Sequence, residues 1–138
     1  MKATQAELTA VAHRHAAAEA AADIEGTMQT LEGEPVYELY PVGRKLSGMA
    51  TVRRYYDYFF ADVLPHTLGY QLRNAWVNDA GLCEEYDIQC RIDGVEHSFR
   101  VLSILKFGER ALTGERLYAD EKFFRFLFGP LWAETEAL

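Results

Sequence analysis

Polar residues interrupt apolar faces in two segments in which apolar and polar residues alternate. At 95–107 the odd positions are apolar except His97 and Ser103, and at 82–92 the even positions are apolar except Glu84. A carboxyl enclosed by apolar walls has a raised pKa and exchanges protons near neutral pH. Glu84 and Ser103 are therefore candidate catalytic residues, although Glu84 could instead reach solvent at a strand end. His97 lies near the end of its segment, either at the surface or in contact with a ligand.

Asp93-Gly94, between these two segments, is typical of a two-residue β-hairpin turn. The register that follows pairs three sets of residues: Ile92 with Val95, Cys90 with His97, and Glu84 with Ser103. Both apolar faces, and the Glu84–Ser103 pair, then lie on one side of the sheet.

The face of the last strand depends on the loop after Phe107. A loop of two or four residues places four residues on the side of Glu84: Leu112, Gly114, Arg116 and Tyr118. A loop of three residues turns them away, and we expect the first arrangement. Arg116 then pairs with Glu84, holds a substrate carboxylate, or forms a plain surface ion pair. Tyr118 contacts the substrate.

Helical periodicity and cap residues predict the elements that position these groups. In a first helix at 5–22, His15 shares a face with Leu8, Val11, Ala18 and Ala22, either as a satisfied histidine or as part of a pocket. A short helix capped by Asp23 is expected next; it carries Ile24, Met28 and Leu31 and is stopped by Gly33 and Pro35. A strand at 36–40 and a helix from Gly48 to Pro65, with Tyr56 in its apolar stripe, follow. The chain ends with strands at 69–77, 82–92, 95–107 and 111–119 and a helix capped by Asp120 and closed by Gly129 and Pro130.

This order of elements predicts an α+β fold in one domain at 1–138. We expect a cone-shaped, curved, mostly antiparallel sheet wrapped around the N-terminal helices. The concave end of such a cone is suited to a small hydrophobic molecule.

Composition excludes several classes of protein. The chain has 138 residues, 49% of them hydrophobic, with 14 basic and 21 acidic side chains and a net charge of −7. Hydrophobic content of this size excludes a disordered chain. The acidic balance without a Lys/Arg cluster argues against nucleic-acid binding, and no apolar run reaches the length that a membrane crossing requires.

Residue spacing gives no sign of a disulfide, a metal or a cofactor. Cys83 and Cys90 fall in one predicted strand, too far apart to bond with each other. No His, Asp or Glu cluster has metal-ligand spacing, and there is no glycine-rich phosphate loop. We expect a reduced, cytoplasmic protein with neither metal nor cofactor.

Two stretches resemble a known superfamily. Residues 23–56, DIEGTMQTLEGEPVYELYPVGRKLSGMATVRRYY, resemble the start of ketosteroid isomerase and of the SnoaL-like polyketide cyclases. Residues 104–120, ILKFGERALTGERLYAD, are similar to the penultimate hairpin and last strand of the same cystatin-like cone superfamily, which includes the nuclear transport factor proteins. The resemblance implies the cone fold, an internal pocket and a homodimer formed through the outer sheet face.

The catalytic pattern of ketosteroid isomerase is not kept. The resemblance places the family's carboxylate base at Tyr40, its oxyanion-binding Tyr at His15 and its oxyanion-binding Asp at Ser103. All three residues differ from the family pattern, and a phenol is a poor base at neutral pH. We therefore do not expect steroid isomerisation by that mechanism.

Three functions remain open. The first is a cofactor-free enzyme that isomerises, cyclises, hydrates or dehydrates a hydrophobic carbonyl compound. Its catalytic residues would be His15, Glu84 and Ser103, and its substrate-binding residues Tyr40, Tyr56, His97, Arg116 and Tyr118. The second is a ligand-binding module without turnover, and the third is a protein-interaction domain that uses the outer sheet face.

Overall fold

The computed structural model describes all 138 residues of the chain, in four α-helices and seven strands. The elements are α1 (Gln5–Ala20), α2 (Ile24–Met28), β1 (Leu31–Tyr40), β2 (Arg44–Ser47), α3 (Met49–Tyr58), β3 (Thr67–Asn78), β4 (Gly81–Ile92), β5 (Val95–Phe107), β6 (Leu112–Tyr118), α4 (Glu121–Phe128) and β7 (Glu136–Ala137). A π-helical turn (Phe59–Val63) and a short 3-10 helix (Leu64–His66) join α3 to β3, and a further 3-10 helix (Gly129–Glu134) follows α4.

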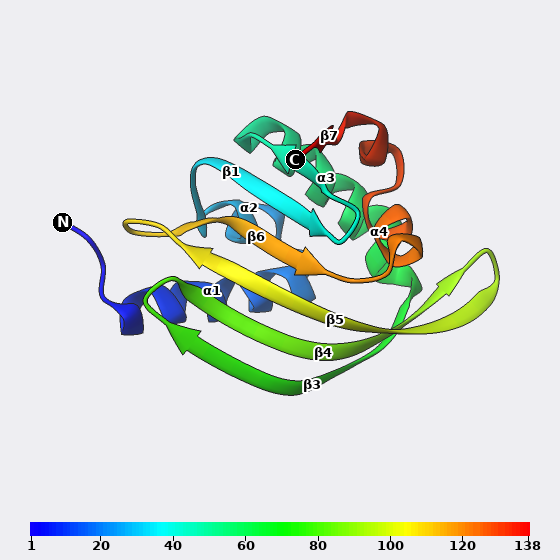
Figure 1. Cartoon of the computed structure of the whole chain (residues 1–138), viewed down its shortest axis with the longest axis horizontal. Coiled ribbons are helices and arrows are strands. Elements are labelled where there is room, and N and C mark those ends of the chain that lie inside the picture. The colour runs from blue at the N-terminus through cyan, green and yellow to red at the C-terminus, as the bar shows by residue number, and fades with distance from the viewer.

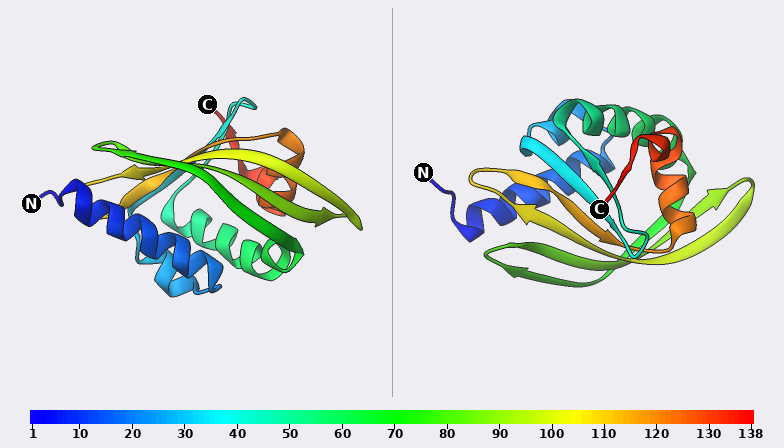
Figure 2. Two further views of the ribbon diagram at one scale, coloured as in Figure 1. Left: turned by 90° about the horizontal axis from the view of Figure 1, so that it is seen from below. Right: turned by 45° about the horizontal axis from the view of Figure 1, so that its top comes forward.

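All seven strands form one curved sheet, in the order β3-β4-β5-β6-β1-β2-β7. Only β1 and β6 pair in parallel. The helices α1 and α3 lie against the same face of the sheet (Figures 1 and 2), which we call the inner face. The predicted α+β class and curved, mostly antiparallel sheet are confirmed.

The first helix begins and packs as its sequence predicts. The Thr4 hydroxyl caps α1 by accepting a hydrogen bond from the backbone N–H of Glu7 (3.1 Å). Most of the predicted face is buried: Leu8, Val11, His15 and Ala18. Ala22 is exposed beyond the end of the helix, with a φ of 54°. Small side chains on this face let α1 lie close to the sheet.

The second helix is shorter than predicted. Asp23 caps it as expected, but α2 ends at Met28 and Leu31 already belongs to β1, paired with Leu112 of β6. Gly33 and Pro35 lie inside an irregular part of β1 instead of stopping a helix. Pairing with β6 outweighs a weak local helix signal. The short strands β2 and β7 were not predicted.

The β4–β5 hairpin has the predicted register. Three expected pairs are present: Ile92 with Val95, Cys90 with His97, and Glu84 with Ser103. The hairpin projects at the end of the molecule opposite the N-terminus in Figures 1 and 2.

The face of β6 is the opposite of the predicted one. Four residues separate Phe107 from Leu112, one of the two loop lengths that we expected to turn Arg116 inward. A β-bulge then shifts the register, so that Lys106 pairs with Gly114 while Phe107 pairs with Leu112. The bulge turns Glu115 and Leu117 to the inner face. Gly114 permits it, because its φ is 129° and a Cβ there would overlap the backbone of Val36 in β1.

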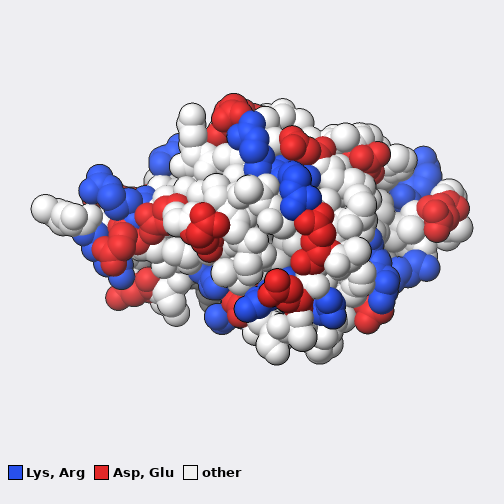
Figure 3. Space-filling view, turned by 90° about the horizontal axis from the view of Figure 1, so that it is seen from above, with Lys and Arg blue, Asp and Glu red and all other residues white.

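The surface of the molecule carries no helix suited to a bilayer. None of the helices combines the length and the apolarity that a membrane crossing requires. On the face shown in Figure 3, acidic and basic side chains are interspersed. The buried core lies between the inner face of the sheet and the helices, around Tyr37, Tyr56 and Phe124.

Candidate functional site

A pocket of about 350 Å³ lies between α1 and the inner face of the sheet. Residues of α3, of the π-helical turn and of α4 also contribute to its walls. The walls are mainly apolar and aromatic, with a few polar groups that converge, as in small-molecule sites. The lining residues are Ala16, Glu19, Ala20, Tyr55, Phe59, Leu64, Thr67, Tyr70, Glu84, Tyr86, Ile88, Ser103, Leu105, Glu115, Leu117, Phe123 and Leu127.

Two of the predicted catalytic residues line this pocket. Glu84 of β4 and Ser103 of β5 enter it side by side, because they are cross-strand partners. Burial raises the pKa of the Glu84 carboxyl, His13 acts in the opposite direction, and Glu19 adds to the rise. Glu84 has no ion-pair partner, so its carboxyl is free to act on a ligand.

A third acidic group, Glu115, reaches the pocket through the β6 bulge. It is 9% exposed and lies beside His15 of α1, with Oε1 3.4 Å from the imidazole Nε2. Burial raises the pKa of the Glu115 carboxyl, the hydrogen bond to His15 opposes this, and the Glu19 charge adds to the rise. Glu115 therefore holds a proton at a higher pH than an exposed glutamate does.

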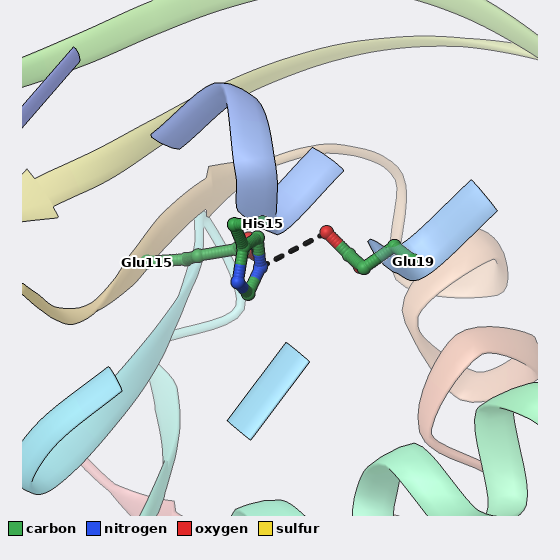
Figure 4. A group of neighbouring side chains, drawn as sticks. All are labelled: His15, Glu19 and Glu115. Atoms are coloured by element: carbon green, nitrogen blue, oxygen red, sulfur yellow. Dashed lines mark ion pairs between the residues drawn. The ribbon is translucent and has the colours of Figure 1, made fainter. Parts of the chain in front are cut away.

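His15 is fully buried behind these carboxylates and does not itself line the pocket. Its Nδ1 lies 2.7 Å from the Thr30 hydroxyl, which donates its own proton to the backbone carbonyl of Thr27 (2.6 Å). The Thr30 oxygen must therefore accept a hydrogen bond from Nδ1–H. That bond fixes the ring orientation and leaves Nε2 facing Glu19 (2.9 Å) and Glu115 (Figure 4).

The two carboxylates determine the charge of His15. Burial by itself lowers the pKa of the imidazole, but Glu19 and Glu115 outweigh it and raise that pKa to about 10. His15 is thus an imidazolium at neutral pH. It supplies the only positive charge in direct contact with the pocket carboxylates.

Tyr56 lies behind the pocket instead of in its wall. Its hydroxyl is 3.1 Å from the Nε2 atom of His15 and 2.6 Å from the hydroxyl of Tyr37. Both tyrosines are fully buried. Tyr56 therefore supports His15, and its predicted contact with a substrate is not direct in this structure.

Three predicted substrate-binding residues lie on the outer face of the sheet. Tyr118 pairs with Tyr40 and stacks on it, with ring centroids 5.1 Å apart. Arg116 forms an ion pair with Glu38 (3.4 Å), the surface-pair alternative, and none of these residues lines the pocket. The prediction that Arg116 and Tyr118 face Glu84 was wrong, because the β6 bulge reverses the alternation.

His97 lies on the inner face but near the hairpin tip. It is half-buried and stacks on Phe99, with ring centroids 5.8 Å apart, while Phe99 packs on Phe123. It does not line the pocket. The structure therefore brings Glu84 and Ser103 into one site, places His15 directly behind it, and leaves His97 outside.

His15, Glu19 and Glu115 also form a group of side chains of the types that ligate metal ions. One ligand atom each from His15, Glu19 and Glu115 can lie within 4.8 Å of the others. Spacing along the sequence does not reveal this group, because Glu115 is far in the sequence from His15 and Glu19. In the structure the two carboxylates contact the imidazole of His15 directly.

Sequence reasoning missed three residues of the site: Glu19, Tyr55 and Glu115. A usable signal existed for Glu19, because His15 and Glu19 are four residues apart and share a helix face. No local pattern marks the β6 bulge, which depends on pairing with β1. Tyr55 could not be told from its many neighbouring aromatic residues.

Comparisons with known proteins identify the fold. No model of a protein family matches the sequence, and no curated protein is similar to it in sequence. Among solved structures, however, 279 chains are similar to this chain. It therefore has the NTF2-like, ketosteroid isomerase-like fold, as the sequence resemblance predicted.

Three of these structures illustrate the likeness. An NTF2-like protein of unknown function from Cytophaga hutchinsonii is 11% identical, with a TM-score of 0.67 over 82% of this chain and 99% of its own. A second such protein, from Burkholderia xenovorans, is 16% identical, with a TM-score of 0.64 over 83% of each chain. A hypothetical protein with a ketosteroid isomerase-like fold from Catenulispora acidiphila, in complex with trimethylamine, is 12% identical, with a TM-score of 0.60 over 78% of this chain and 83% of its own. Identities this low show the fold alone.

Proposed function

We propose that this protein is a cofactor-free enzyme that moves a proton on a hydrophobic carbonyl compound, in an isomerisation, cyclisation or hydration/dehydration. One observation carries the proposal: two carboxyls with raised pKa values, Glu84 and Glu115, line a single apolar pocket. Carboxyl groups whose pKa is raised by burial are an established means of acid–base catalysis near neutral pH.

The roles of the residues follow from their placement. Glu115 takes a proton from the carbon next to the substrate carbonyl, and the electrons of the broken C–H bond move to the carbonyl oxygen. The hydroxyls of Ser103 and Tyr55 donate hydrogen bonds to that oxygen. The proton then returns from Glu115 to another carbon or to the oxygen. No net charge is created or lost over the cycle.

His15 is a positioning residue in this scheme. Its imidazolium lies behind Glu19 and Glu115 and touches no space that a substrate can enter. It orients the two carboxylates and offsets part of their charge. The Tyr55 phenol remains a hydrogen-bond donor, because burial raises its pKa well above the usual value.

Deuterium exchange tests the proposal without knowledge of the natural substrate. Bicyclic ketones such as 2-tetralone and 2-decalone are incubated with the protein in D₂O, and loss of the α-proton signals is followed by NMR. We expect catalysed exchange that falls by roughly 10²–10⁴-fold in Glu115→Gln. The neighbouring variant Arg116→Gln, on the outer face, keeps the wild-type rate.

A ligand-binding module without turnover is the second candidate. The observation in its favour is the outer-face position of Tyr40, where the resemblance places the base of ketosteroid isomerase. Saturable binding of the same ketones, with proton exchange no faster than in buffer, would contradict the enzyme and support this binding module. If the ketones neither bound nor exchanged their α-protons, the result would contradict the pocket as a functional site.

The same resemblance supports a homodimer through the outer sheet face. Trp76 and Tyr118 are 55% and 38% exposed there. The charges of that face occur as pairs of both signs, such as Asp87 with Arg73 and Glu38 with Arg116, so these positions carry no excess of one sign that would repel a second copy. Sedimentation of the wild type should give a dimer and of Trp76→Glu a monomer. A wild-type monomer at micromolar concentration would contradict this part.

A further inference from the structure

The pocket is acidic and lacks any basic wall. Three of its lining residues are glutamates, Glu19, Glu84 and Glu115, and none is a lysine or an arginine. The single imidazolium of His15 lies behind the pocket and is already bound to Glu19 and Glu115. Glu84 has no ion pair or hydrogen bond of its own, so its carboxyl faces the cavity without a cation in contact.

The apolar part of the wall is largely aromatic. Five of its residues carry aromatic rings: Tyr55, Phe59, Tyr70, Tyr86 and Phe123. The faces of such rings attract a cation within about 6 Å, by up to about 2 kcal/mol when water is excluded. Aromatic walls and free carboxylates therefore favour the same kind of ligand.

An unpaired hydroxyl in the wall also calls for a ligand. Tyr55 is 3% exposed and lines the pocket, and its hydroxyl makes no hydrogen bond within the chain. No side-chain oxygen or nitrogen of the protein is both sealed from solvent and unpaired. The Tyr55 oxygen is therefore open to the pocket, where a polar group of a ligand can take the place of water as its partner.

We propose that the ligand of this pocket is an organic cation: a compact hydrophobic compound that carries a protonated amine, which forms an ion pair with Glu84. The inference rests on the proposed function, since it names the substrate class of the same site. For the proposed reaction the substrate is then a carbonyl compound with an amino group. Arg116, the one residue expected to hold a substrate carboxylate, lies on the outer face, so an anionic ligand finds no partner.

Three ligands of nearly equal size and shape test the charge preference. Binding of 2-naphthylmethylamine, 2-naphthylmethanol and 2-naphthoate is measured by isothermal titration calorimetry at pH 7. A charged hydrogen bond that is lost costs about 1.5–3 kcal/mol, so the amine should bind roughly ten- to a hundredfold more tightly than the alcohol. The carboxylate should bind most weakly.

Matched variants locate the effect. In Glu84→Gln the amine should lose most of its advantage while affinity for the alcohol stays within about twofold. Glu85→Gln, the next residue along and on the outer face, should behave as wild type. An alcohol that binds as tightly as the amine, or a carboxylate that binds best, would overturn the inference and leave the pocket as a ligand site. If none of the three ligands bound, the result would contradict the pocket as a ligand site, and with it both the proposed function and this inference.

Discussion

Acidic side chains on the two faces of the sheet have opposite environments and opposite pKa shifts. On the outer face Asp87 binds Arg73 and Arg100, which lower its pKa to about 2. On the inner face Glu84 and Glu115 have no arginine or lysine partner, and burial raises their pKa values. Glu84 and Asp87 are only three residues apart in β4, so the alternation of the strand alone separates the two environments.

This difference separates two uses of charge. The outer carboxylates are paired and partly solvated, and such pairs contribute little to stability. The inner ones are held in an apolar pocket with less countercharge than they need, a costly arrangement that a binding or catalytic site can use. We therefore expect inner substitutions to affect function and stability strongly and outer ones to affect both weakly.

The largest effect is expected from His15→Gln. Removing one partner of a buried ion pair leaves Glu115 without its cation, at a cost of about 3–5 kcal/mol in the free energy of unfolding. Arg116→Gln on the outer face should cost about 0–1 kcal/mol. Urea unfolding at pH 8 and pH 6 checks both, and the His15 effect should be larger at pH 6, where the contribution of the imidazolium is complete. Equal losses in the two variants would contradict the contrast between the faces.

The pH dependence of wild-type stability is the second expectation. The pKa of His15 rises from 6.5 to about 10 on folding, so its contribution is complete below pH 6.5 and is lost as the pH rises toward 10. The free energy of unfolding should therefore fall across this range. In His15→Gln this part of the slope should be absent. A wild-type profile that is flat from pH 7 to pH 9.5 would argue against a charged His15.

Glu84→Gln and Glu85→Gln should differ in sign. Folding raises the pKa of Glu84. The ionised form of Glu84 therefore destabilises the folded protein once the pH exceeds the pKa that this carboxyl has in the unfolded chain. At pH 7 Glu84→Gln should therefore stabilise the protein by about 0.5–1 kcal/mol. Glu85→Gln loses an exposed ion pair with Arg100 and should be neutral or slightly destabilising. Thermal unfolding measures both, and a destabilised Glu84→Gln would show that Glu84 is well solvated.

The smallest effect is expected for Asp87→Asn. The pKa of Asp87 is lowered from 3.8 to about 2, so its contribution is present above pH 3.8 and is lost as the pH falls toward 2. At pH 7 the variant should lose little stability, because the pair is exposed and screened by solvent. Acid unfolding should begin at a slightly less acidic pH in Asp87→Asn than in the wild type, because the variant lacks this contribution at every pH.

Much of the fold and part of the site could be predicted from the sequence. The alternation and the Asp93-Gly94 turn gave the register that joins Glu84 to Ser103, because a two-residue turn leaves no freedom in the pairing. The periodicity of the first helix placed His15 on its buried face. These are local signals, and they were confirmed.

What could not be predicted depends on contacts distant in the sequence. The β6 bulge forms where Gly114 passes close to Val36 of β1, and it exchanges Arg116 for Glu115 in the pocket. A single extra residue reverses every later side chain of a strand, so an error there changes the whole set of site residues. Leu31 likewise joined a strand only through its pairing with Leu112.

The most direct test of the contrast between the faces is the titration of the His15 ring by NMR in the wild-type protein, with His15→Gln used to assign its signal. A buried imidazolium held between two pocket carboxylates should remain protonated at pH 8 and lose its proton with a midpoint near 10. A midpoint at or below 6.5, the value of a free histidine, would show a neutral ring and contradict the account.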